Sequence, residues 1–282
     1  MNRILVGAAA LAALAYPAAA FAQNDGAQAE TVFDGDYLTV GIGAGYGPSY
    51  EGSDDYVLFP APVVQGNLSG IAITPRPGGI ALDFIPDAKD AKVGFSFGPV
   101  VRLRSNRTGH IKDDVVKRLG ELDTAVEVGA NAGITVYDLL SGYDSLTFSS
   151  DVRWDVASAH EGMVIAPSVS YFTPVSRGAA VSLSLGAEHV DDDYADYYFS
   201  VSPAGTAASG LPTFQADGGW KSVGANLLVG VDFDGELANG GLAGFVLGGY
   251  TRLLGDAKRT PLTSIRGDAD QWTIGAGLAF TF

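Results

Sequence analysis

The sequence predicts an all-β protein: a transmembrane antiparallel up-and-down β-barrel of about 12 strands, preceded by an N-terminal signal peptide. Three observations predict this class. The chain begins with a secretion signal, its mean hydropathy is positive although the rest of it has no long apolar segment, and its apolar residues alternate with small or polar ones. A closed barrel is expected to show this combination, because every second residue faces lipid and the backbone groups pair between strands.

The N-terminus carries the secretion signal. Arg3 gives a basic start, Ile4 to Ala15 is almost purely apolar, and Ala20-Phe21-Ala22 fits the small-x-small cleavage pattern. An uncleaved anchor is disfavoured, because the apolar stretch is shorter than the ~20 residues of a spanning helix. We therefore predict a signal peptide over 1–22 cleaved after Ala22, a short periplasmic segment over 23–35 and a barrel over 36–282.

Composition excludes several functions. The chain has 17 Lys and Arg against 32 Asp and Glu, a net charge of −15, so nucleic acid is a poor partner. It has no Cys, and so no disulfide framework and no thiolate metal site. The sequence predicts no cofactor.

The alternation assigns the strands. In the last segment Trp272, Ile274 and Leu278 alternate with residues such as Thr273 and Gly277, which places the apolar set against lipid. Twelve strands are predicted, near Asp36–Gly47, Val57–Asn67, Leu68–Ile85, Lys92–Arg104, Leu122–Tyr137, Ser145–Val156, Gly162–Thr173, Ala179–His189, Tyr194–Ser202, Lys221–Asp234, Leu242–Leu254 and Gln271–Phe282.

The assignment is hardest between Val57 and Ala91, which contains five prolines. Splitting Leu68–Ile85 at Pro75–Gly78 would add a strand and make the count odd. We expect a single kinked strand, because single-chain bacterial barrels have even numbers.

An even count places both termini in the periplasm. The chain ends in Phe280-Thr281-Phe282, which resembles the aromatic signal that outer-membrane barrels present to their assembly machinery. We therefore expect the protein in the outer membrane of a Gram-negative cell, surrounded by outer-membrane lipid, with Phe282 contacting the barrel assembly machinery.

The segment Ser105–Glu121 then falls on the periplasmic side, where turns are normally short. Its apolar residues recur at helical spacing, and its basic residues make it a candidate partner-docking segment: Arg107, Lys112, Lys117 and Arg118. A plug or a plain loop packed on the barrel rim is the alternative, and a miscounted strand would place the segment outside the cell.

Charged residues are predicted at inward positions. They are Arg102, Arg104, Glu127, Asp151, Arg153, Asp155, Glu188, Asp232 and Arg252, with Asn131 and Asn226 beside them. Their mixed signs indicate internal ion pairs, which could fill the lumen or line a narrow channel. A selective pore would more naturally show a ring of one sign.

The three histidines offer no clear catalytic site. His189 stands close to Asp191, Asp192 and Asp193, which could orient an imidazole or bind a cation, but a solvated acidic turn is the favoured interpretation. His160 is also assigned to a turn. We predict no catalytic, cofactor-binding or metal-binding residue.

Three blocks resemble a known family. Gly41–Ser53, Tyr194–Val201 and Arg252–Ala257 with Pro261-Leu262 are similar, in this order and spacing, to conserved blocks of the MipA/OmpV outer-membrane proteins. The resemblance implies a non-enzymatic barrel that acts as a scaffold between a murein transglycosylase and a murein synthase. Other members of the family suggest the alternatives of a porin-like channel for small solutes or a surface antigen or adhesin.

Overall fold

The computed structural model describes residues 31–88 and 91–282. The predicted signal peptide, its cleavage after Ala22 and residues 23–30 lie outside the described residues. Within the described part, no helix is long and apolar enough to cross a membrane.

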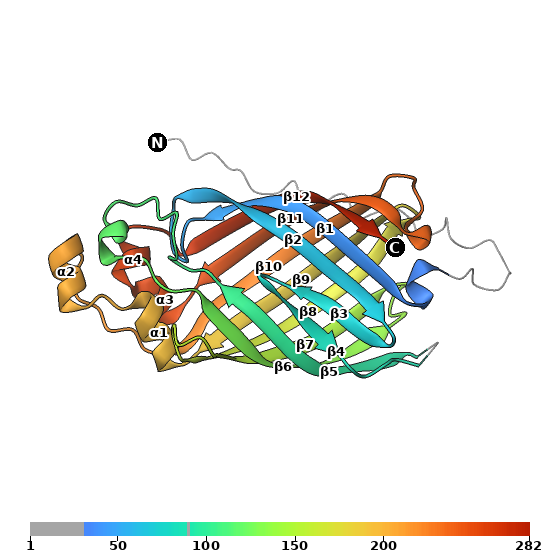
Figure 1. Cartoon of the computed structure of the whole chain (residues 1–282), viewed down its shortest axis with the longest axis horizontal. Coiled ribbons are helices and arrows are strands. Elements are labelled where there is room, and N and C mark those ends of the chain that lie inside the picture. Colours follow the sequence, from blue (N-terminus) through green and yellow to red (C-terminus); the bar gives the residue numbers. More distant parts are fainter. Residues whose placement is uncertain (1–30, 89–90) are drawn as a thin grey trace. The chain divides into compact units, whose positions relative to one another are not determined.

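Twelve antiparallel strands close into a barrel, which confirms the predicted fold class (Figure 1). Each strand pairs with its neighbours in chain order, and β1 closes the ring by pairing with β12. The strands are β1 (Tyr37–Pro48), β2 (Tyr56–Leu68), β3 (Ile71–Arg76), β4 (Gly79–Asp83), β5 (Val93–Arg104), β6 (Ala125–Tyr137), β7 (Ser145–Asp155), β8 (Met163–Ser176), β9 (Ala179–Val190), β10 (Gly219–Asp232), β11 (Gly241–Leu253) and β12 (Asp270–Thr281).

The two faces of the wall differ as the alternation predicts. On β12 the outward Trp272, Ile274 and Leu278 are between 51% and 61% exposed, whereas Gln271 between the strand start and Trp272 points inward and is buried. Ile42 on β1 lies opposite Leu278, so the closing pair continues the apolar outer belt. The exterior can therefore face lipid.

The single kinked strand predicted over Leu68–Ile85 is wrong. The segment forms two short strands, β3 and β4, which pair with each other through a turn at Pro77-Gly78. Gly78 has φ +73°, a conformation that glycine adopts without strain, and Pro77 has no N–H for a ladder. The turn chemistry of this pair therefore produces two strands where the sequence analysis expected one.

The strand predicted over Tyr194–Ser202 is also wrong. Asp192–Phe199 forms helix α1, whose first turn is capped by the Asp191 carboxylate, which accepts a hydrogen bond from the Tyr194 N–H. Buried Tyr194 and Tyr198 lie one helical turn apart on its inner face. The two errors offset each other, so the total remains twelve strands.

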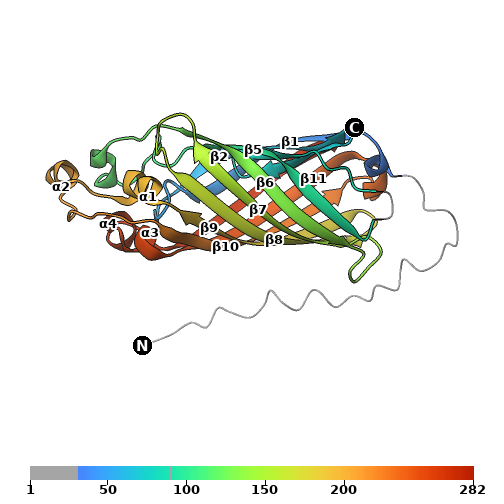
Figure 2. The same ribbon diagram turned by 90° about the horizontal axis from the view of Figure 1, so that it is seen from below.

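The loops are distributed unequally between the two ends of the barrel. The helices α1, α2 (Pro203–Ser209), α3 (Gly255–Arg259) and α4 (Pro261–Ser264), together with the 3₁₀ helix Val116–Leu119, gather at one end, which we call the capped end (Figure 2). The opposite end, which we call the terminal end, holds the 3₁₀ helices Val32–Asp34 and Leu237–Asn239 and the C-terminus. There the Phe282 N–H donates to the Leu38 carbonyl.

Two apolar clusters hold the loops of the capped end together. One contains Tyr194, Tyr198 and Phe199 of α1 with Leu253 and Ala257, all at most 3% exposed. The other joins Tyr50, Ile111, Val116, Val201, Leu211 and Leu262 from four different loops. The loops form one packed layer over the barrel mouth, which we call the loop layer.

Candidate functional site

Directly beneath the loop layer, a cluster of charged side chains fills the lumen. Nine residues make it up, and we call them the ion-pair layer: Glu51, Arg76, Arg102, Arg104, Glu127, Asp151, Arg153, Glu188 and Lys221. They come from the loop after β1, from β3 and from the ends of β5, β6, β7, β9 and β10 that meet the loop layer.

Glu127 lies at the centre and is fully buried. Its Oε1 accepts from Arg104 Nε at 2.5 Å, and its Oε2 accepts from Arg153 Nε at 2.9 Å. His160 Nε2 is 3.5 Å from the same carboxylate. Each carboxylate oxygen thus faces its own guanidinium, which compensates for removing both charges from water.

Two further carboxylates bridge the remaining cations. Glu188 Oε1 lies 2.7 Å from Arg102 and 3.2 Å from Arg104, and Glu188 Oε2 lies 2.5 Å from Lys221 Nζ. Glu51 accepts from Arg104 at 2.8 Å and from Lys221 at 3.0 Å. Burial alone would raise the pKa of Glu51, but the charges of Lys221 and Arg104 outweigh it and hold that pKa below its usual value.

Asp151 completes the ion-pair layer on the β7 side. It accepts from Asn131 Nδ2 at 2.6 Å and from Arg153 at 2.9 Å, and Arg76 reaches it across the lumen with Nε at 3.1 Å. Five cations therefore share four carboxylates in mutual contact. The cluster mixes charges of both signs, whereas a selectivity filter presents one sign.

The loop layer contacts these charges from above. The Tyr194 hydroxyl lies 3.4 Å from Glu51 Oε2, and its ring faces the Arg104 guanidinium at 5.1 Å. Burial raises the pKa of Tyr194 well above its usual value, so the hydroxyl stays protonated and remains a donor. The sequence block around Tyr194 therefore packs directly on the ion-pair layer.

The structure brings together six of the nine charged residues that the sequence placed in the lumen. These are Arg102, Arg104, Glu127, Asp151, Arg153 and Glu188. Asp155 and Asp232 instead accept backbone N–H groups of the turns that follow their strands. Arg252 was misplaced: it pairs in register with outward Val223, and it binds Asp270 at 2.7 Å on the outer rim.

Sequence reasoning missed Glu51, Arg76, Lys221 and His160. Lys221 would face outward by simple alternation, but a β-bulge between Trp220 and Ser222 turns it inward. Arg76 stands at the tip of the β3–β4 hairpin, which the single-strand assignment concealed. His160 was assigned to a solvated turn and is buried.

The candidate docking segment lies at the other end of the barrel from the one predicted. Because Leu68–Ile85 contains two strands, β5 runs toward the capped end, and Ser105–Glu121 belongs to the loop layer. Arg107 is buried there, with its guanidinium near the Tyr198 and Gly120 carbonyls, while Lys112, Lys117 and Arg118 are exposed. The miscounted strand thus reversed the side of the segment.

Asp113 anchors this segment. Its carboxylate accepts from the Val115 and Val116 N–H groups at 2.8 Å and from Arg266 Nη2 at 2.6 Å. Burial would raise the pKa of Asp113, but the hydrogen bonds from Arg266, Val116 and Val115 outweigh burial and hold it below its usual value. The loop between β5 and β6 is therefore tied to the loop between β11 and β12.

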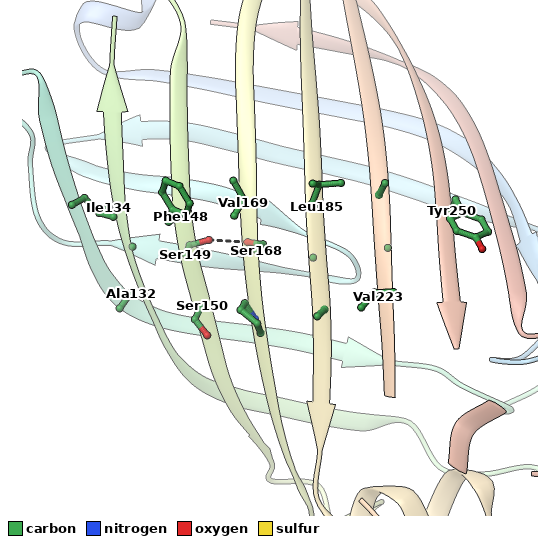
Figure 3. A pocket seen from close by; sticks show the side chains of 16 residues that line it. Ala132, Ile134, Phe148, Ser149, Ser150, Ser168, Val169, Leu185, Val223 and Tyr250 are labelled. Carbon is green, nitrogen blue, oxygen red and sulfur yellow. Dashed lines mark hydrogen bonds between the residues drawn. The ribbon is translucent and has the colours of Figure 1, made fainter. Parts of the chain in front are cut away.

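Toward the terminal end the lumen changes character. Its inward residues on β7, β8 and β9 are small and hydroxylated, and Ser149 and Ser168 share a hydrogen bond of 3.0 Å (Figure 3). A hollow of about 870 Å³ over this part of the wall lies on the outer face, because Ile134, Phe148 and Leu185 in its lining point outward. Among the described residues, no group of three His, Cys, Asp or Glu could hold a metal ion.

The closed wall, apolar exterior and charged interior define the class of the protein as a membrane-spanning β-barrel of the outer-membrane type. The family model described as "MltA-interacting protein MipA" matches residues 40–282, and the chain belongs to this family. The resemblance inferred from the three sequence blocks is thereby confirmed.

Several solved structures show a distant similarity to this chain. The NanC porin structure is 7% identical, covers 87% of this chain and 98% of its own, and gives a TM-score of 0.43. The outer membrane protein OprD from Pseudomonas aeruginosa is 12% identical over 89% of this chain and 66% of its own, with a TM-score of 0.37. The Pseudomonas putida toluene transporter TodX is 9% identical over 88% and 89%, with a TM-score of 0.34. No curated protein matches the sequence.

Proposed function

We propose that this protein is a non-enzymatic docking protein of the Gram-negative outer membrane, which holds a murein transglycosylase of the MltA type at its periplasmic face. The family description names MltA as the partner of MipA. The observation that carries the proposal is the ion-pair layer, because a lumen crossed by paired charges of both signs is better suited to presenting a surface than to passing solutes.

The orientation decides which surface faces the enzyme. With both termini in the periplasm, the terminal end meets periplasmic partners, and the capped end lies outside the cell. A docking surface for murein enzymes is therefore expected at the terminal end.

An exposed apolar surface is present at that end. Leu139, Leu140 and Tyr143 on the turn between β6 and β7 are 45%, 81% and 60% exposed. Apolar side chains that extend beyond the strand ends in one group are typical of contact surfaces.

The turn that carries this surface is rigid. The Asp144 carboxylate accepts from the Leu140 N–H at 2.9 Å, the Ser141 N–H at 3.1 Å and the Tyr171 hydroxyl at 2.7 Å. A preorganised turn loses little conformational entropy when a partner binds. We take Leu140 as the central residue of the docking surface.

Capture from cross-linked cell envelopes tests the proposal. Tagged wild-type protein should retain an MltA-type transglycosylase, and Leu140→Asp should lose it because a charge would enter an apolar contact. Arg118→Ala, at the capped end, serves as the matched control and should capture as much as wild type. If Leu140→Asp captures as much enzyme as wild type, this surface is not the docking site. If wild type captures no such enzyme, the proposed docking function is wrong.

A channel for small solutes is the second candidate. The accessible hydroxyl-lined lumen at the terminal end favours it, with Leu228 pointing inward and 41% exposed. The ion-pair layer opposes it, since a solute would have to displace paired charges that have left water.

A further inference from the structure

The barrel wall has an incomplete seam on the side of β2 that faces the β3–β4 hairpin. β2 pairs with β3 through only three residue pairs, Gly66–Ile73, Asn67–Ala72 and Leu68–Ile71. Within residues 31–88 and 91–282, the edge of β2 from Tyr56 to Gln65 has no strand partner on this side. The hairpin strands have six and five residues, too few to follow the 13 residues of β2 (Figure 1).

The seam lies at the depth of the lipid belt. Tyr56 and Tyr46 stack with ring centroids 5.5 Å apart on the outer surface, in the position of an interfacial aromatic girdle. Leu58 follows on the same face toward the terminal end and is 76% exposed. An open strand edge at this depth is unusual, because unpaired backbone groups are costly in hydrocarbon.

Two prolines reduce that cost on this edge. The β1–β2 ladder continues without a register break past Pro60 and Pro62. A proline has no N–H to donate, and in an antiparallel strand the N–H and C=O of one residue point to the same side. The missing donors therefore belong to the edge that faces the seam, so fewer polar groups there lack a partner.

The inner surface beside the seam is apolar. Val57, Phe59, Ala61 and Val63 alternate with the outward prolines and so face the lumen. Phe59 is 39% exposed although it points inward, and its ring lies against Gly45 and Gly47 of β1. The walls of β7, β8 and β9 present hydroxyl groups instead, such as Ser149 and Ser168. The inner face of β2 thus forms an apolar strip of the lumen, and the seam borders it.

Arg76 fixes the hairpin tip. It faces the lumen next to the turn at Pro77-Gly78, and its Nε and Nη2 lie 3.1 and 3.3 Å from the Asp151 carboxylate. On its other side the hairpin is held by the pairing of β4 with β5, and the Leu103 N–H donates to the Gly78 carbonyl at 2.8 Å. This ion pair therefore sets how far the tip can move from β2.

We propose that the seam admits one acyl chain of a membrane lipid from the bilayer to the apolar strip around Phe59, and that the Arg76–Asp151 pair restricts this entry. The seam opens at hydrocarbon depth, its edge is poor in donors, and the surface behind it is apolar. The occupant is a bilayer lipid, whose headgroup remains at the aromatic girdle while its chain enters.

Site-specific fluorescence quenching tests the proposal, because the chain has no cysteine of its own. A bimane label is attached to Phe59→Cys, to outward Leu58→Cys and to inward Ser149→Cys, which lies on β7 and is paired with both β6 and β8. Each variant is placed in vesicles of phosphatidylcholine with brominated or unbrominated chains, after heat-modifiable migration shows that it is folded. Ala61→Cys serves as a second inward probe if Phe59→Cys does not fold.

Bromine quenches on contact, so the position of the acyl chain can be read directly. We expect loss of fluorescence at Phe59→Cys comparable to that at Leu58→Cys, and none at Ser149→Cys. Adding Arg76→Gln should deepen the loss at position 59, whereas Lys92→Gln, which breaks an exposed ion pair with Asp138, should not. Equal, weak quenching at positions 59 and 149 would overturn the lipid site, and an unchanged signal with Arg76→Gln would overturn the restricting role of the ion pair.

Discussion

Replacing Glu127 by Gln should destabilise the barrel more than almost any other isosteric change, because it removes a fully buried charge between two guanidinium groups. Arg104 Nε and Arg153 Nε lie 2.5 and 2.9 Å from the two carboxylate oxygens. The amide would keep one acceptor and turn N–H groups toward a guanidinium that can only donate. Breaking a buried pair on one side costs about 3–5 kcal/mol.

The lower part of that range applies here, since Arg104 keeps Glu51 and Glu188, and Arg153 keeps Asp151. About 3 kcal/mol corresponds to roughly a hundredfold change in the unfolding equilibrium constant. Urea unfolding in lipid vesicles, followed by tryptophan fluorescence, measures it. Glu236→Gln, which removes an exposed ion pair with Arg177, should cost less than about 1 kcal/mol. If both variants unfold at the same urea concentration, the buried layer does not stabilise the barrel.

Three further outcomes are expected. Leu278→Arg, on the outer face of β12, should destabilise the barrel by ~2–4 kcal/mol near the bilayer midplane, and inward Thr273→Ser should change its stability little. The same urea titration measures both variants. Equal stability of the two would contradict the outward direction assigned to Leu278. Because the pKa of Asp113 is lowered in the folded protein, its contribution to the stability of the loop layer is present above the unfolded value of about 3.9 and is lost as pH falls through the folded value. Acid should therefore expose the loop between β5 and β6 to protease, and Asp113→Asn should show the same sensitivity at neutral pH. Protease cleavage of the wild type that does not depend on acid would refute this. Leu262→Ala, at a 1% exposed position, should loosen the loop layer by about 2–5 kcal/mol, seen as faster loop cleavage in a barrel that still migrates as folded.

Much of the fold could be predicted because the alternation of a half-buried strand is local. In a strand such as β12, the alternation alone shows which residues point outward and which point inward, without information from the rest of the chain. Tyr194–Phe199 could not be assigned this way, since its aromatic residues suit a strand or a helix face equally. The Asp191 side chain caps the N-terminus of this segment and so favours the helix over a strand. The acidic residues just before the aromatic segment are the sequence signal that could have predicted the helix.

The candidate site was accessible only in part for a related reason. Alternation locates Arg104, Glu127 and Glu188, which stand on regular strands. It cannot locate Lys221, which a bulge redirects, or Glu51, which a loop folds back over the lumen. The end of the barrel at which each loop lies is harder still to predict. One overlooked turn at Pro77-Gly78 places every later loop at the wrong end, until a second error restores the strand count.

The central claim is that the ion-pair layer and the loop layer close the lumen, and the current across a planar bilayer that contains the purified wild-type protein tests it most directly. The paired charges around Glu127 and Glu188 predict no stable openings at any applied voltage below that which breaks the bilayer. Large, long-lived and ion-selective openings of the unmodified protein would contradict a closed lumen and establish a channel in its place.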